Sequence, residues 1–272
     1  MNFILSFIFS FLFLIGVSQN KTEIIIDREQ TNDGVILYVT NNESCPVSTA
    51  FNFDLENLKS SFDEEQILVI PEKAQRFKIA ELKAIDRRKG WRFSYDYQAN
   101  LGDINVSEYD ADHVYELPYN KGNSFIINQG YNGSTSHKNE NAFDFNMPEG
   151  TEILAARGGL VVKVVQDNTQ AGFKEEYKKY NNYIIIYHSD GTFASYAHIQ
   201  FNGARVKEGD VVNPGDLIAL SGNVGYTTGP HLHFACYLPG MDKPQTLATK
   251  FKTGTGQNAE YLQEKESYYK NY

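Results

Sequence analysis

The stretch Gly229-Pro230-His231-Leu232-His233-Phe234 decides how the C-terminal half of this 272-residue chain folds. On a β-strand, residues i and i+2 point to the same face, so His231 and His233 are expected on one face and Leu232 and Phe234 in a core. Such a pair is common by chance, and its weight depends on partners that could complete a metal-centred site. Three upstream segments offer them: Ser136-His137, Phe143-Asp144-Phe145 and Tyr196-Ala197-His198.

The segments around these residues predict a second all-β domain over residues 118–250. Short apolar runs alternate with Gly-, Pro- and Asp-containing turn signals, and helical periodicity is nearly absent. The expected strands cover residues 141–147, 153–165, 183–187, 192–198, 211–212, 217–220 and 231–238. The charged insertion at 167–181 is either one wall of a substrate groove or a solvated loop or short helix, and its composition favours the second.

Residues 19–117 predict a small all-β, sandwich-like domain. Apolar residues alternate with polar or small ones over 47–55 and again over 91–97, which is the pattern of half-buried strands. Residues 67–70 form a short apolar run that ends at Pro71. Nothing in this half indicates catalysis, and His113 beside two aspartates is expected in a solvated acidic turn. The domain is either a binding or shielding module or a structural spacer.

The two ends of the chain differ in character. Residues 1–18 are expected to be a signal peptide, because 3–17 are almost wholly apolar and small residues follow. The alternative is an uncleaved anchor, but the run is short for a full span, so no stable membrane span is expected after cleavage. The polar C-terminal tail, 251–272, is expected either to pack as an edge segment or to fray.

Charge and cysteine content limit the possible partners. The net charge of -9, without a basic patch, argues against nucleic acid and anionic membranes as partners. Cys45 and Cys236 lie far apart, and two separate buried thiols are favoured over an interdomain disulfide. Cys236 has the strand parity of Leu232 and Phe234, so it is not expected to bind metal.

The ordered motifs of the C-terminal half resemble those of the lysostaphin-like (LytM-type) zinc metallopeptidases, which cut peptide cross-links of bacterial peptidoglycan. The resemblance covers roughly residues 117–245. It is carried by these segments: Ser136-His137, Ala142 to Phe145, Pro148 to Thr151, Ala155 to Gly159, Tyr196 to His198 and Gly229 to Phe234. One departure is that six residues separate His137 from Asp144, where the shortest family pattern has three; residues 138–141 are expected to loop out.

The resemblance implies a role for each site residue. His137, Asp144 and His233 would bind one Zn²⁺ per chain and leave a coordination position for water. His198 and His231 would take part in the chemistry, one as general base and the other as a donor to the oxyanion or leaving amine, with the assignment between them open. Tyr131 would add a hydrogen bond to the oxyanion.

The expected function is therefore that of an exported zinc metalloendopeptidase, periplasmic or extracellular, acting on peptidoglycan peptides. Two alternatives stay open. Some relatives have lost ligands and activate cell-wall amidases, but a chain that keeps all five metal-site and catalytic residues argues against this role. A proteinaceous substrate is the other. The bond that is cut and the oligomeric state are unknown.

Overall fold

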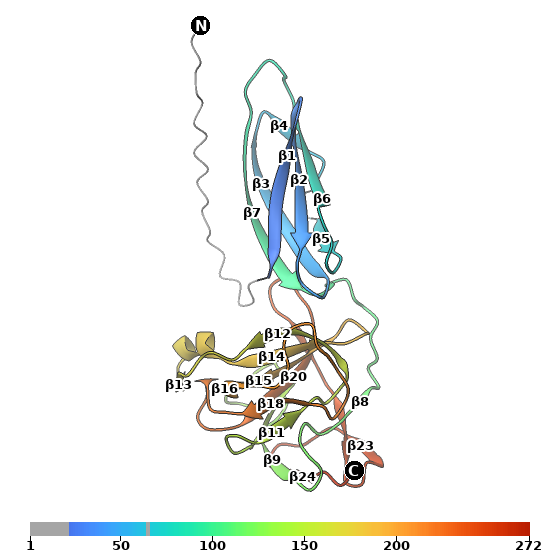
Figure 1. The fold of residues 1–272 in the computed structure, drawn as a ribbon, viewed down its shortest axis with the longest axis vertical. Coiled ribbons are helices and arrows are strands. Elements are labelled where there is room, and N and C mark those ends of the chain that lie inside the picture. The colour runs from blue at the N-terminus through green and yellow to red at the C-terminus, as the bar shows by residue number, and fades with distance from the viewer. Residues whose placement is uncertain (1–21, 64–65) are drawn as a thin grey trace.

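The computed structural model describes residues 22–63 and 66–272, and within them two β bodies are stacked along the long axis (Figure 1). The one helix in these ranges is the short 3₁₀ helix η1 (Glu175–Tyr180), so the predicted all-β class is confirmed. None of the described helices has the length and apolar character needed to cross a bilayer. The expected signal peptide at 1–18 lies outside the described residues.

The N-terminal body is a sandwich of two sheets with strand orders β1-β2-β6-β4 and β5-β3-β7. Its strands are β1 (Ile24–Thr31), β2 (Gly34–Asn41), β3 (Val47–Glu56), β4 (Leu58–Ser60), β5 (Ile67–Ile70), β6 (Phe77–Ala84) and β7 (Arg92–Leu101). Leu37 and Leu82 of one sheet and Phe51 of the other belong to one buried cluster. The predicted alternation is confirmed by β3 and β7, which pair with Phe51 opposite Tyr97.

The C-terminal body is built on a nine-stranded sheet in which β17-β12-β14-β15-β20-β10-β9-β24 follow one another and β21 also pairs with β20. Its strands are β9 (Ser124–Gln129), β10 (Ala142–Phe145), β12 (Gly159–Val165), β14 (Tyr183–Tyr187), β15 (Phe193–Ala197), β17 (Val211–Val212), β20 (Leu232–Leu238), β21 (Gln245–Leu247) and β24 (Ser267–Tyr269). The strand β14 is an unbroken apolar run because both its faces are covered: Ile184 and Ile186 lie in the main core, and Ile185 lies in a second cluster.

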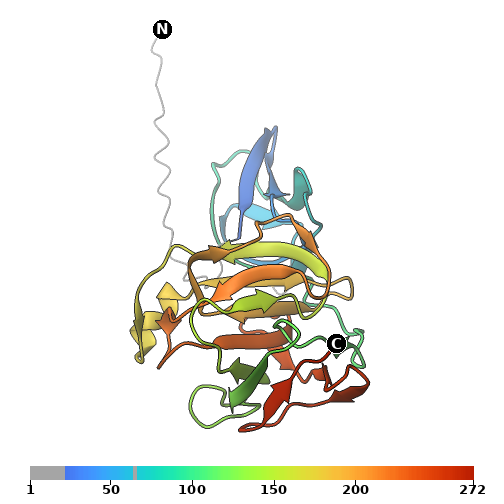
Figure 2. The ribbon, with the colours of Figure 1, turned by 60° about the horizontal axis from the view of Figure 1, so that its bottom comes forward.

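Smaller sheets complete this body (Figure 2). They consist of β11 (Glu152–Leu154), β18 (Leu217–Ser221) and β16 (Ile199–Ala204); of β13 (Ala171–Gly172) and β19 (Gly225–Tyr226); and of β23 (Asn258–Glu260), β22 (Lys250–Thr253) and β8 (Val114–Tyr115). The C-terminal segment packs as an edge: β24 pairs with β9, and the Tyr272 hydroxyl accepts a hydrogen bond from the Leu117 amide at 3.0 Å.

The N-terminal body packs on the face of the large sheet that also carries His233. The shared cluster is apolar and draws on both bodies: Cys45, Val47, Ala99, Leu101, Val162, Ile185 and Phe193. Between β15 and β20, Phe193 pairs with Tyr237 and Ala197 pairs with His233. Paired and alternate residues share a face, so one end of this face is covered and the other carries the histidine.

Candidate metal centre

Two neighbouring strands bring an aspartate and a histidine together at the centre of the large sheet. In the pairing of β10 with β20, Asp144 lies directly opposite His233. Their chain neighbours Phe143 and Phe234 are fully buried on the opposite face. The apolar–polar alternation of both strands thus fixes the two polar side chains on one face, as the sequence predicted.

His137 completes a set of three donor groups. Its ring reaches the cluster from the loop after β9, and ligand atoms of His137, Asp144 and His233 all lie within 4.8 Å of one another. Asp144 Oδ1 is 3.2 Å from His137 Nε2 and 3.0 Å from His233 Nδ1. Two imidazoles and one carboxylate at this spacing form a donor set that can hold a divalent metal.

The protonation of this cluster follows from its burial and hydrogen bonds. Burial alone would raise the pKa of Asp144, but hydrogen bonds from His137 and His233 outweigh it and hold that pKa well below its usual range. Asp144 is therefore a carboxylate near neutral pH. His137 Nδ1 donates to the Gly130 carbonyl at 3.0 Å, so Nε2 is the ring nitrogen that faces the cluster.

The other two predicted histidines lie beside this cluster. The His198 ring centroid is 4.5 Å from that of His231 and 5.9 Å from that of His233. His198 Nδ1 donates to the Val224 carbonyl at 2.8 Å, and His231 Nδ1 donates to the Gly229 carbonyl at 2.8 Å. A carbonyl oxygen can only accept, so each ring has its proton on Nδ1 and a lone pair on Nε2.

Both of these rings are neutral near pH 7. Burial, followed by the nearby His231 and His233, lowers the pKa of His198 to about 3. Burial also lowers the pKa of His231. His198 has a positive φ of 63°, which turns the chain just after β15 and brings its side chain to the Val224 carbonyl. Two neutral imidazoles with free Nε2 atoms can accept protons next to the metal-binding set.

The Tyr131 hydroxyl points to Thr249 and not to the histidine cluster. Its hydroxyl donates to the Thr249 carbonyl at 3.1 Å and accepts from the Thr249 amide at 2.6 Å. Its ring packs at 4.3 Å from that of Phe143, on the core side of β10. The single hydroxyl proton is already used, so the expected hydrogen bond from Tyr131 to an oxyanion is not supported by this geometry.

The insertion before β14 contacts the segment next to Val224, whose carbonyl holds His198. The Gly225 amide donates to the Gln170 carbonyl at 2.7 Å, and Phe173 stacks on Tyr226 with a centroid distance of 4.9 Å. Val224, the partner of His198, directly precedes this paired segment. The helix η1 itself buries no residue. The insertion is therefore a solvated short helix joined to a strand that supports the site.

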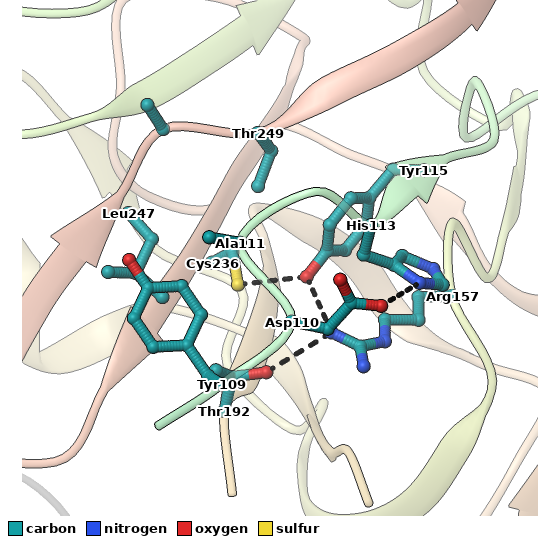
Figure 3. Close-up of a pocket in the computed structure, with 11 residues that line it drawn as sticks. Tyr109, Asp110, Ala111, His113, Tyr115, Arg157, Thr192, Cys236, Leu247 and Thr249 are labelled. Carbon is teal, nitrogen blue, oxygen red and sulfur yellow. Dashed lines mark hydrogen bonds and ion pairs between the residues drawn. The ribbon is translucent and has the colours of Figure 1, made fainter. Parts of the chain in front are cut away.

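A separate polar cluster lies behind β20, around Arg157 (Figure 3). Arg157 pairs with Asp190 at 2.9 Å and contacts the Tyr115 hydroxyl at 3.3 Å, and that hydroxyl lies 3.0 Å from Cys236 Sγ. Cys236 therefore faces away from the histidines, as its parity predicted. Both cysteines are free and buried. His113 Nδ1 lies 3.5 Å from an oxygen of Asp110 at the rim of this cluster.

One further group that contacts the site has no obvious sequence signal. Gln129 donates from Nε2 to Asp144 Oδ2 at 3.1 Å. The sequence shows it only as the start of a Gly-rich loop, because its contact depends on the register in which β9 pairs with β10. The main-chain carbonyls that hold the histidine rings, those of Gly130, Val224 and Gly229, could not be predicted from the sequence either, because every residue type has a carbonyl.

An all-β body that brings together two histidines and an aspartate as a candidate metal-binding set, with two neutral histidines beside it, is typical of metal-dependent hydrolase domains. Residues 138–245 match Peptidase family M23, beginning one residue after His137. The chain therefore carries a domain of peptidase family M23, and the resemblance inferred from the sequence is confirmed.

Known proteins of this kind are similar to the domain. The peptidoglycan DD-endopeptidase ShyA of Vibrio cholerae is 36% identical over 100 residues, covering 37% of this chain and 20% of that protein. Lysostaphin of Staphylococcus simulans is 30% identical over 115 residues, covering 42% and 19%. The solved catalytic domain of lysostaphin aligns with 28% identity and a TM-score of 0.34 over 46% of this chain and 87% of that domain. The chain spans 18 to 26% of the length of the first curated relatives.

Proposed function

We propose that this chain is an exported zinc metalloendopeptidase that hydrolyses peptide cross-links of bacterial peptidoglycan. The observation that carries the proposal is the convergence of His137, Asp144 and His233, whose ligand atoms lie within 4.8 Å of one another. Peptidoglycan as the substrate is supported by relatives named peptidoglycan DD-endopeptidases. Export is supported by the apolar segment at 3–17 and its small-residue end.

The donor set suits zinc in particular. Zinc favours imidazole nitrogen and carboxylate oxygen in tetrahedral sites, and three protein ligands leave the fourth position open. His137 would bind through Nε2 and His233 through Nδ1, the atoms that already face Asp144 Oδ1. When bound, zinc would lower the pKa of a water molecule and polarise the scissile carbonyl.

The chain's own residues would move the protons. His198 and His231 each present an unprotonated Nε2, because Nδ1 is held by a main-chain carbonyl. One of them would accept the proton of the attacking water, and a protonated ring would return a proton to the leaving amine. His231 Nε2 lies 3.6 Å from Asp144 Oδ1, which places it at the edge of the metal set. The two rings would act together as one acid–base pair.

Digestion of purified peptidoglycan sacculi tests the proposal. The zinc-loaded chain from residue 19 onward is compared with His233→Ala, with a chelator-treated sample and with His113→Ala as a control histidine outside the centre. We expect loss of cross-linked dimers by mass spectrometry with wild type and His113→Ala only. A folded, zinc-loaded wild type that cleaves no sacculi from several wall types would overturn the proposal, and would favour an amidase activator or a protein substrate.

A further inference from the structure

The two oxygens of Asp144 have different partners. Oδ1 faces the histidines His137, His233 and His231 at 3.2, 3.0 and 3.6 Å. Oδ2 instead accepts a hydrogen bond from Gln129 Nε2 at 3.1 Å. Gln129 therefore occupies the oxygen that does not face the histidines, and it leaves Oδ1 as the oxygen available to a metal.

The same Gln129 amide also holds the loop that carries His137. Its Oε1 accepts from the main-chain amides of Thr135 at 2.9 Å and Ser136 at 3.1 Å, and its Nε2 donates to Ser136 Oγ at 2.7 Å. These two residues directly precede His137, whose ring is in turn held by the Gly130 carbonyl. One buried side chain thus links both the aspartate and the first histidine of the set.

The surrounding backbone is shaped to admit this side chain. Gln129 is only 8% exposed and lies directly opposite Asp144 in the pairing of β9 with β10. The loop closes over it at Gly133, where a Cβ would stand 2.3 Å from Gln129 Cγ. Because real Cβ atoms essentially never approach so closely, the position needs glycine for Gln129 to keep its place.

We infer that Gln129 is a positioning residue for the metal centre, an inference that rests on the proposed function. It would keep Asp144 binding through one oxygen, and it would fix Thr135 and Ser136, the residues that directly precede His137. Partners of metal ligands orient those ligands, and their loss typically weakens metal binding by roughly 10- to 100-fold.

Zinc affinity tests this role without relying on activity. The dissociation constant of Zn²⁺ is measured by competition with a chromophoric chelator for the wild type and for Gln129→Met, which keeps the side-chain length and removes the hydrogen bonds. Gly133→Ala is a second variant that displaces the Gln129 side chain without changing residue 129, because the added Cβ would clash with Gln129 Cγ. In the described part of the chain a Cβ at Gly90 meets no atom within 4 Å, so Gly90→Ala is the matched control.

We expect Gln129→Met and Gly133→Ala to weaken zinc binding by roughly 10- to 100-fold, and Gly90→Ala to bind as wild type. Melting in chelator shows whether the metal-free fold is intact; if Gln129→Met does not fold, Gly133→Ala decides. The visible absorption of the Co²⁺-loaded protein gives a second readout, because its intensity falls if the released Oδ2 binds as an additional ligand.

The failures are distinguishable. Wild-type zinc affinity and an unchanged Co²⁺ spectrum in folded Gln129→Met and Gly133→Ala, with binding lost in His233→Ala, would overturn the positioning role and leave the metal site intact. Wild-type zinc affinity in His233→Ala would instead overturn the proposed function itself.

Discussion

Acid destabilisation of this fold should depend on one buried histidine, His188. Its side chain lies at the turn after β14 and is fully buried, with Nδ1 held by the Gly158 carbonyl at 2.8 Å. Its Nε2 has no hydrogen-bond partner among the described residues. Burial lowers the pKa of His188 from 6.5 to about 4, and nearby Arg157 acts in the same direction.

The direction of the effect follows from where protons bind. The folded chain keeps His188 neutral, whereas the unfolded chain protonates it below about 6.5, so the unfolded state takes up more protons as the pH falls. The stabilisation that the neutral His188 ring gives the folded state is complete above the unfolded pKa of about 6.5. It is lost progressively as the pH falls below that value, and the loss is complete only below the folded pKa of about 4. At about 1.4 kcal/mol per pKa unit, the free energy of unfolding should fall by about 2 kcal/mol at pH 5 and about 3 kcal/mol at pH 4.

Urea unfolding at pH 7.5, 6, 5 and 4, with chelator present throughout, measures this loss. The test variant is His188→Asn, whose amide can still donate to the Gly158 carbonyl but does not titrate. The control is His113→Asn, which removes a partly exposed histidine. We expect the pH slope to flatten in His188→Asn by the amount given above and to persist in His113→Asn. Parallel slopes for the wild type and His188→Asn would refute the assignment to this residue.

Three further predictions concern the metal centre. His233→Ala should abolish zinc binding and cleavage together, because it removes one of three ligands; dialysis and metal analysis check the first, and sacculus digestion the second. His198→Ala and His231→Ala should each keep zinc but lower the turnover number by roughly 10²- to 10⁴-fold, since they act on protons rather than on the metal; a loss of zinc in either would contradict the assigned roles. Tyr131→Phe should keep wild-type turnover and lose about 1 kcal/mol of stability, because its hydroxyl serves Thr249, and a large drop in turnover would restore it to the site.

Much of the sheet could be predicted because hydrophobic spacing reports which faces are buried. The alternation over 47–55 gave β3, and the unbroken apolar run 183–187 gave β14 to the residue. The C-terminal edge strand β24 carries no such pattern, because its Ser267, Tyr268 and Tyr269 are not fully buried and the strand is held by pairing with β9. Edge pairing depends on backbone groups, which every sequence has.

In the candidate site, too, some residues could be predicted from the sequence and others could not. Three candidate ligands could be predicted from the sequence, because residue type shows which side chains can bind a metal and strand parity shows which of them share a face. They are His137, Asp144 and His233. The direction of the Tyr131 ring could not be predicted, because nearness to His137 along the chain does not fix it; contacts with the buried Phe143 and the Thr249 main chain do. Gln129 could not be found because its role exists only once β9 and β10 are in register.

The position of the N-terminal body bears on its role. It covers the Phe193 end of the sheet face, while Ala197, four residues along the same strand, pairs with His233. Four residues of strand span about 13 Å, so the covered area ends close to the metal centre. The shared cluster places the N-terminal body beside the candidate metal centre, as the shielding alternative predicts; deleting residues 20–117 and measuring activity would separate this alternative from a structural spacer.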